Sequence, residues 1–220
     1  MCAALGDDGL PAGLARRADG TPACWWGEGH EDYAAYHDRE WGLPVLADVP
    51  LYEKMCLEGF QSGLSWLTIL RKRTHFRAAF SGFDFEQVAS FGAGDVERLL
   101  GDAGIVRHRG KIEATINNAR AAIHTVETHG SLAAFFWSFE PEPAARPAQI
   151  DHAAVADMAT TAESTAMSRA LKKLGWRFVG PTTCYALMQA AGIVNDHLEG
   201  CHRRQKIEEM RSLVVRQQIL

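Results

Sequence analysis

The amino-acid sequence predicts an all-α protein. Apolar residues recur at helical spacing in several segments, no strand-type alternation persists, and residues that start or stop helices recur along the chain. Apolar residues make up 47% of the 220 residues and charged residues 23%, which is ordinary for a globular protein. The length suits one domain with short terminal extensions.

Helix start and stop signals place the elements in order. Aspartate and serine favour helix starts because their side chains accept hydrogen bonds from free backbone N–H groups, and glycine favours helix ends. The expected helices begin in turn at Asp32, Asp48, Leu64, Asp84, Asp95, Lys111, Ser164 and Gly180. Residues 140–150 are rich in Pro, Ala and Glu and are expected to form a loop.

The two ends of the chain differ from its middle. Residues 1–22 show no periodicity and are rich in Gly, Pro, Ala and Asp, so we expect a disordered leader there. A single folded domain is expected over 23–203. The tail over 204–220 is amphipathic and is expected to be either helical or frayed.

Composition and charge exclude several classes of protein. The net charge of −4 excludes an overall basic coat for nucleic acid, although local basic patches are compatible with it. No apolar run approaches the roughly 18 residues of a membrane span. The first residues carry acids where a signal peptide needs an apolar stretch, so we expect a cytoplasmic protein without a membrane partner. The five cysteines are odd in number and dispersed, which favours thiols or metal ligands over disulfides.

Two pairs of residues suggest a metal site. Cys24 and His37 lie near the start of the chain, and His197 and Cys201 form an i,i+4 pair near its end. Two thiolates and two imidazoles make a closed tetrahedral zinc site, which would join the two ends of the domain. Spacing alone leaves an alternative open, because a buried cysteine is often a small apolar residue and a buried histidine is often a hydrogen-bonded core residue.

Aromatic residues surround one acid in the sequence. Six of them flank Glu58, namely Trp25, Trp26, Tyr33, Tyr36, Trp41 and Trp66. Aromatic faces stack on a flat ring and attract positive charge, and a carboxylate accepts hydrogen bonds from amino groups, so this set suits a cationic, planar ligand. The alternative is that the aromatic residues are ordinary core and Glu58 is a solvated helix residue.

A helical hairpin with a tight turn spans 171–192. Gly175 and Gly180 bracket the turn, and the amides that start the second helix could hold a phosphate. Lys172, Lys173 and Arg177 add positive charge. This pattern resembles a helix-hairpin-helix motif, which contacts the DNA backbone without reading sequence. A generic pair of antiparallel helices is the alternative.

Together these segments resemble the bacterial 3-methyladenine DNA glycosylase I family. The resemblance covers about 24–201 and is carried by the runs YAAYHDREWG, CLEGFQSGLSW, DAGIVRHRGKI, RALKKLGWRFVGPTTCYALMQAAG and VNDHLEGC. It implies a helix-hairpin-helix glycosylase fold in which a structural zinc joins the N- and C-terminal segments. The family's four zinc ligands fall on Cys24, His37, His197 and Cys201.

The resemblance also implies roles for other residues. The glutamate that reads the base falls on Glu58, the stacking tryptophan on Trp66 and the cooperating tyrosine on Tyr36. Further base-binding aromatics fall on Trp26, Tyr33 and Trp41. The residues implied to contact DNA are Ser62, Gly63, Leu64, Lys172, Lys173, Gly180, Thr182 and Thr183.

The implied activity is hydrolysis of the N-glycosidic bond of 3-methyladenine in alkylated double-stranded DNA, with free 3-methyladenine as product. The base would flip out of the stack and Leu64 would fill the gap. No lysine is clearly placed to form a Schiff base, so we expect a monofunctional enzyme without strand cleavage. A bacterial, cytoplasmic monomer is expected.

Two other functions fit the sequence less well. A zinc deaminase acting on nucleobases would need a His-x-Glu and a Pro-Cys-x-x-Cys motif, and neither occurs. A non-catalytic DNA-binding module could use the hairpin and the zinc site, but it would not need aromatic residues around an acid.

Overall fold

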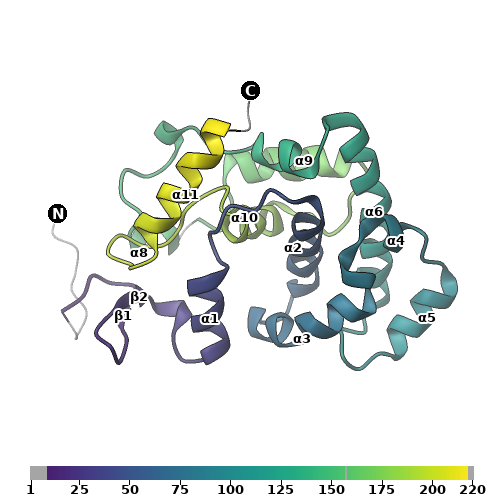
Figure 1. The fold of residues 1–220 in the computed structure, drawn as a ribbon, viewed down its shortest axis with the longest axis horizontal. Helices are drawn as coiled ribbons and strands as arrows, with labels where there is room; N and C mark the ends of the chain where they lie inside the picture. The colour runs from purple at the N-terminus through teal and green to yellow at the C-terminus, as the bar shows by residue number, and fades with distance from the viewer. Residues whose placement is uncertain (1–8, 157, 218–220) are drawn as a thin grey trace. The chain divides into compact units, whose positions relative to one another are not determined.

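Over the described residues the chain is helical apart from one short hairpin, as the periodicity predicts (Figure 1). The computed structural model describes residues 9–156 and 158–217. Its elements are β1 (Leu14–Arg16), β2 (Pro22–Cys24), η1 (Trp25–Gly27), α1 (Glu31–Arg39), α2 (Asp48–Gln61), α3 (Trp66–Ala79), η2 (Ser81–Phe83), α4 (Phe85–Ala89), α5 (Ala93–Gly101), α6 (Arg109–His129), α7 (Leu132–Trp137), η3 (Pro143–Ala145), α8 (His152–Ala156), α9 (Ala162–Lys173), α10 (Pro181–Ala190) and α11 (Arg204–Gln217). No helix in these ranges combines the length and the apolar character needed to cross a membrane.

The chain divides into two compact units, where the sequence predicts one domain over 23–203. The first unit combines Met1–Pro44, Glu140–Thr161 and Met188–Leu220, and the second combines Val45–Phe139 and Ala162–Leu187. Because the chain passes between the units several times, neither unit is a continuous segment with a linker that composition could reveal.

The described part of the expected disordered leader is folded. Residues 14–16 and 22–24 form an antiparallel hairpin in which Leu14 pairs with Cys24. Leu14 and Cys24 also belong to a small buried cluster with Ile150, Leu198 and Cys201. Strands of three residues are too short to show an alternating pattern, which is why the sequence did not reveal them. Residues 1–8 lie outside the described residues.

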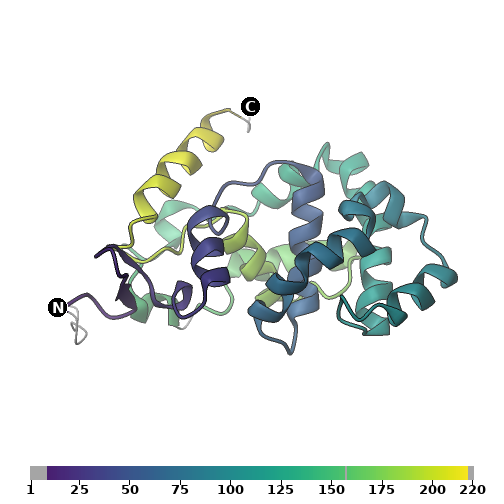
Figure 2. The ribbon, with the colours of Figure 1, turned by 60° about the horizontal axis from the view of Figure 1, so that its bottom comes forward.

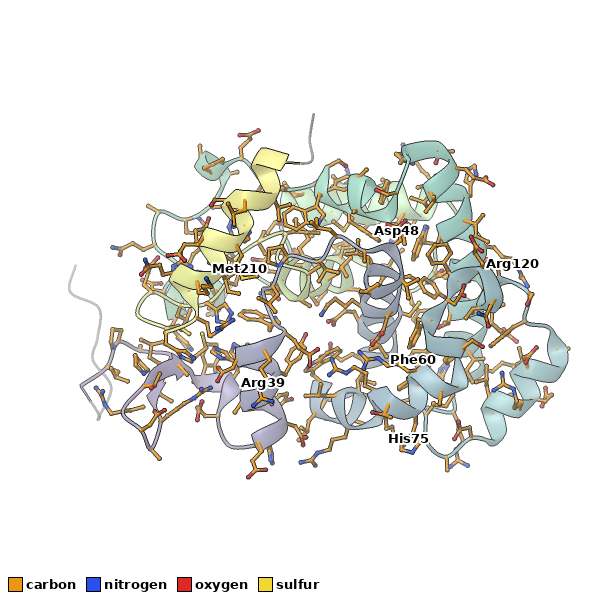
Figure 3. All side chains as sticks on the ribbon, in the orientation of Figure 1. Arg39, Asp48, Phe60, His75, Arg120 and Met210 are labelled. Carbon is orange, nitrogen blue, oxygen red and sulfur yellow. The ribbon has the colours of Figure 1, made fainter. Side chains whose placement is uncertain are left out.

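The long helix α6 is central to the second unit. Helix α4 packs along it in both ribbon views (Figures 1 and 2), and α5 makes a smaller contact with it. The hydroxyl of Tyr52 on α2 donates a hydrogen bond to the carbonyl of Thr115 on α6, at 2.8 Å. Phe60, near the C-terminal end of α2 (Figure 3), is fully buried against Phe76, with 4.6 Å between ring centroids. This packing fixes the C-terminal end of α2, which carries Glu58 and leads into the turn 62–64.

The aspartates act at helix starts in more than one way. Asp84 caps α4 as expected, accepting hydrogen bonds from the backbone N–H groups of residues 86 and 87. Asp48 does not cap α2, because it lies inside that helix and accepts hydrogen bonds from Leu132 and Ala133 at the start of α7. Asp32 lies in the first turn of α1, which begins after His30. A local pattern cannot distinguish these uses, since Asp48 and Leu132 are far apart in sequence.

Candidate functional site

Four candidate metal ligands meet inside the first unit. The donor atoms of Cys24, His37, His197 and Cys201 all lie within 4.8 Å of one another, and all four side chains are buried. His37 Nε2 is 3.2 Å from His197 Nδ1 and 3.5 Å from Cys201 Sγ. His197 Nδ1 is 3.6 Å from Cys201 Sγ and 3.9 Å from Cys24 Sγ. The ends of the chain are thus joined at this cluster, as the sequence predicts.

These separations match the spacing of ligands around one tetrahedral ion. With metal–sulfur distances of about 2.3 Å and metal–nitrogen distances of about 2.05 Å, such an ion separates two nitrogens by about 3.3 Å and a nitrogen from a sulfur by about 3.6 Å. The His37–His197 and Cys201–histidine separations lie within about 0.1 Å of these values, and the Cys24–His197 separation is about 0.3 Å longer. The cluster could therefore hold a metal ion with little rearrangement.

Hydrogen bonds from outside the cluster orient both imidazole rings. His37 Nδ1 lies 2.7 Å from the Asp38 carboxylate, and His197 Nε2 lies 3.1 Å from the carbonyl oxygen of Trp41. If each of these nitrogens carries the ring proton, the nitrogen left free on each ring is the one that faces the other ligands. Arg17 in turn holds Asp38 through two hydrogen bonds, at 2.5 and 3.0 Å, and these interactions keep the pKa of Asp38 low, at about 2.

Two glycines let the backbone approach the ligand histidines closely. A Cβ atom on Gly27 would lie 2.9 Å from the His37 ring, and one on Gly42 would lie 3.2 Å from the His197 ring. Gly42 also has a φ of +81°, which disfavours other residues there. A side chain at either position would push a ligand out of place.

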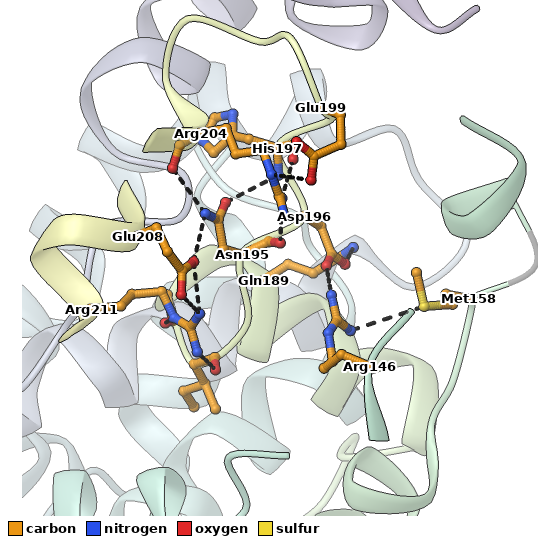
Figure 4. A network of polar contacts seen from close by, with 12 residues as sticks. Arg146, Met158, Gln189, Asn195, Asp196, His197, Glu199, Arg204, Glu208 and Arg211 are labelled. Atoms are coloured by element: carbon orange, nitrogen blue, oxygen red, sulfur yellow. Dashed lines mark hydrogen bonds and ion pairs between the residues drawn. The ribbon is translucent and has the colours of Figure 1, made fainter. Parts of the chain in front are cut away.

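The segment that carries His197 is held from both sides by arginines (Figure 4). Arg204 donates to the His197 carbonyl at 2.7 Å, and Asn195 donates to the Arg204 carbonyl and to the Glu208 carboxylate, both at 3.0 Å. Asp196, which is buried, pairs with Arg146 and accepts a hydrogen bond from Gln189 at 2.8 Å. This acid is therefore committed to a structural network beside the four candidate metal ligands.

Helix α11 fastens the start of that segment through Arg211. The guanidinium donates to the carbonyls of Gly192 and Ile193, at 2.7 and 2.8 Å, and pairs with Glu140 at 2.6 Å. Of the residues expected to be helical or frayed, 204–217 thus form a helix whose side chains hold the segment that carries His197, and 218–220 lie outside the described residues.

Arg211→Ala is expected to destabilise the protein by about 2–3 kcal/mol, because it leaves buried carbonyls and a carboxylate without their donor. Urea-induced unfolding followed by circular dichroism would measure the change. Lys206→Ala is the matched control, since Lys206 lies on the same helix with its side chain 62% exposed and should change stability by less than about 0.5 kcal/mol. Equal stability of the two variants would show that Arg211 does not fasten the segment.

The aromatic residues predicted to bind a base divide between the two units. Trp26, Tyr33, Tyr36 and Trp41 lie in the first unit, where Trp26 contacts Trp41 with ring centroids 4.7 Å apart. Trp26 also packs against His37, at 5.2 Å, and Trp41 against His197, at 4.7 Å. Two of these four residues therefore also support the ligand rings. Trp25 lies apart from them, 45% exposed, with its ring on His152.

Glu58 is a buried acid in the last turns of α2, not the solvated helix residue of the alternative interpretation. Only 6% of the residue is exposed, and burial raises its pKa to about 8, although Lys54 opposes the shift. Among the described residues none forms a hydrogen bond or an ion pair with its carboxyl group. Buried carboxyl groups normally have such partners, so this one is available to a ligand.

The turn 62–64 directly follows α2 and is held by a lysine that the sequence did not single out. Lys111 donates to the carbonyls of Phe60 and Ser62, at 2.8 and 2.6 Å, and is itself 8% exposed. Gly63 has a φ of +77°, and Leu64 is 40% exposed. Trp66, half-buried, begins α3 after this turn. The basic run at 107–111 suits either an extension of the DNA-contacting surface or a solvated face, and nothing in the sequence shows that its lysine turns inward.

The predicted hairpin is formed by α9 and α10. Lys172, Lys173 and Thr182 are exposed, and Gly180 and Thr183 are half-buried at the start of α10. Asn118 on α6 holds the turn by accepting from the Arg177 N–H at 2.7 Å and donating to the Arg177 carbonyl at 2.9 Å. Asn117 donates to the Gly175 carbonyl at 2.7 Å. Helix α6 therefore supports both the hairpin turn and, through Lys111, the turn 62–64.

Comparisons with known proteins agree with these features. The family described as methyladenine glycosylase matches residues 25–204. The chain is 48% identical to DNA-3-methyladenine glycosylase 1 of Escherichia coli over 81% of this chain and 94% of that protein. It is 42% identical to DNA-3-methyladenine glycosylase of Haemophilus influenzae over 82% of this chain and 97% of that protein. A structure of 3-methyladenine DNA glycosylase I from Staphylococcus aureus, reported for its recognition of 3-methyladenine, is 35% identical, covers 83% of this chain and 96% of its own, and has a TM-score of 0.77.

Proposed function

Because this chain belongs to the methyladenine glycosylase family, we propose that it hydrolyses the N-glycosidic bond of 3-methyladenine in alkylated double-stranded DNA. The family match and the two relatives at 42–48% identity support an enzyme of this class. The structural observation that carries the proposal is the burial of Glu58, whose carboxyl group has no hydrogen-bond or ion-pair partner among the described residues. Glu58 lies one helical turn before the exposed turn 62–64 and its leucine.

Glu58 can distinguish the damaged base from adenine by charge. Methylation at N3 makes the base cationic, and a cation beside a carboxyl group favours its ionised form and lowers its pKa. Binding of the methylated base would thus make Glu58 release its proton to solvent water and form an ion pair, with the amino edge of the base donating to the carboxylate. A neutral adenine offers no such charge, and it is also the poorer leaving group.

The cationic base needs little help to leave, so the task of the site is to capture it and to stabilise positive charge on the sugar. Flipping costs a few kcal/mol, and least for damaged bases. Leu64 would fill the gap, as apolar side chains do in other kinked duplexes. Trp66 would stack on the base, and Trp26, Tyr33, Tyr36 and Trp41 are further base contacts by their match to the family's pattern.

DNA would be held by the hairpin and the turn after α2. The N-terminal end of α10, with Gly180, Thr182 and Thr183, offers N–H groups to a phosphate, and Lys172 and Lys173 add charge. Ser62 and Gly63 would accompany Leu64. These contacts are independent of sequence, which suits an enzyme that searches for one damaged base.

We further propose that the four-residue cluster holds one zinc ion. Two thiolates and two imidazoles are the donor set of structural zinc, and four protein ligands leave no open position for catalysis. In that role zinc would cross-link the two ends of the first unit and would take no part in the reaction.

The proposed enzyme is monofunctional and acts as a monomer. Among the described residues Lys111 is the one buried lysine, and it contacts the turn 62–64, but its ammonium group is committed to two backbone carbonyls. A lysine that attacks the sugar must instead be neutral and free to approach it. Sodium borohydride should therefore trap no covalent protein–DNA adduct.

The direct test is to incubate the protein with duplex DNA treated with a methylating agent and to identify the released bases by chromatography. We expect free 3-methyladenine together with abasic sites that break only on alkali treatment. Binding to that DNA without any released base would instead indicate the non-catalytic DNA-binding module.

A further inference from the structure

Phe178, in the hairpin turn between α9 and α10, combines an unusual backbone with an exposed ring. Its φ is +56°, a conformation that favours glycine, and 42% of the residue is exposed. Phe83 also has a positive φ, of +59°, but that side chain is fully buried in the core. Core packing therefore explains the backbone of Phe83 and does not explain that of Phe178.

The residues on either side of Phe178 are fixed, and this imposes the backbone conformation at 178. Arg177 is bound at both its N–H and its carbonyl by Asn118. Val179 is 1% exposed, and its carbonyl accepts a hydrogen bond from Ser168 at 2.6 Å. With both neighbours fixed, the turn needs a left-handed residue at 178, and glycine would supply it at lower cost. A phenylalanine at such a position indicates that its ring has a use.

Phe178 lies against the last turn of α2, which leads into the turn that carries Leu64. A Cβ atom on Gly59, in the last turn of α2, would lie 3.4 Å from the Phe178 Cβ. Lys111 holds Ser62 at the end of the same helix, and the ring of His108, just before α6, is 6.5 Å from that of Phe178. Leu64 and Phe178 are two of the five exposed large apolar residues described, and both emerge near this end of α2.

We propose that Phe178 is a second apolar contact with DNA, made beside Leu64 at the step from which the damaged base has left. This rests on the proposed function. The exposed lysines of the hairpin would hold the backbone. A base that has lost its stacked neighbour presents a free face on which an aromatic ring can stack. The ring would thus stabilise the opened duplex, and base recognition would stay with Glu58.

Phe178→Gly separates this role from a structural one, because it removes the ring and relieves the backbone. We expect its Tm to equal or exceed that of the unaltered protein, while its Kd for a duplex with an abasic-site analogue rises about 5- to 100-fold, the range for loss of one base–aromatic stack. Affinity for free 3-methyladenine should stay unchanged. Phe178→Leu, which keeps an apolar side chain, should recover part of the lost affinity.

Ser81→Gly is the matched control. Ser81 is exposed and has a φ of +51°, so glycine relieves the backbone there without removing a ring. It should raise or preserve the Tm and leave the Kd for the abasic duplex unchanged. An unchanged Kd in Phe178→Gly would overturn the proposal and would instead favour a protein partner as the group that the exposed ring contacts. A lower Tm together with parallel losses of DNA binding and base binding would also overturn it, because the ring would then be shown to stabilise the fold. Failure of the proposed function would appear separately, as absence of base release by the unaltered protein.

Discussion

Glu58→Gln is expected to slow the release of 3-methyladenine by about 10²- to 10³-fold, the usual effect of removing one charged or hydrogen-bonding group that acts in the transition state. Glutamine keeps the size of the side chain and an acceptor oxygen, but it cannot become negative opposite the cationic base. The measurement is the single-turnover rate of base release with enzyme in excess over methylated DNA. Retention of the unaltered rate would exclude Glu58 from the reaction.

Glu53→Gln is the matched control for that experiment. Glu53 lies on the same helix and pairs with Arg77 at 2.8 Å. It undergoes the same carboxyl-to-amide substitution, yet it has no part in the proposed site. We expect a rate of base release within about twofold of the unaltered enzyme, since a partly exposed ion pair contributes little. A loss as large as that of Glu58→Gln would show that a change in α2 alone slows the enzyme.

The raised pKa of Glu58 also predicts how the stability of the unaltered protein and that of Glu58→Gln depend on pH. The folded pKa of about 8 lies above the ordinary value of 4.5, so the folded state holds a proton that the unfolded state releases. Stability from this group is complete below about pH 4.5 and is lost as the pH rises through 8. Glu58→Gln removes that dependence, so its Tm should match that of the unaltered protein at low pH and exceed it increasingly toward pH 9.

Much of the candidate site could be predicted because it depends on residue type and local spacing. Cys24 and His37 at one end of the chain, with His197 and Cys201 at the other, have the composition of a tetrahedral site, and the structure places them together. The exposed lysines of the hairpin and the turn at 62–64 lie next to helix ends, and the residues that mark those ends are close to them in sequence. Resemblance to the family added the roles of Glu58 and Trp66, which spacing left open.

The missed features depend on partners distant in sequence. Lys111 contributes by reaching the carbonyls of Phe60 and Ser62, and Arg211 by reaching those of Gly192 and Ile193. Backbone carbonyls leave no trace in the sequence, so a cation that binds them looks like any surface charge. The left-handed backbone of Phe178 is hidden for the same reason, because Asn118 on α6 helps to impose it.

Loss of a metal ligand should have the largest effect on stability. Zinc in small structural sites contributes about 10–16 kcal/mol of folding free energy, which equals or exceeds the whole stability of a typical domain, about 5–15 kcal/mol. Cys201→Ala removes one of four ligands and leaves three buried donors facing a space that a metal would fill. We expect it to abolish the stoichiometric zinc of freshly purified protein and to lower the Tm by more than about 10 °C.

The consequences should be greatest in the first unit, because all four ligands belong to it. Limited proteolysis of Cys201→Ala should cut within 9–44 and 188–217 before it cuts α2 or α6. Cys184→Ala is the control, since Cys184 is equally buried but has no metal-ligand neighbours among the described residues, and it should keep one zinc per chain. One zinc per chain in Cys201→Ala, or none in the unaltered protein, would contradict the zinc assignment, because the four observed separations of 3.2–3.9 Å would then reflect hydrogen bonding alone.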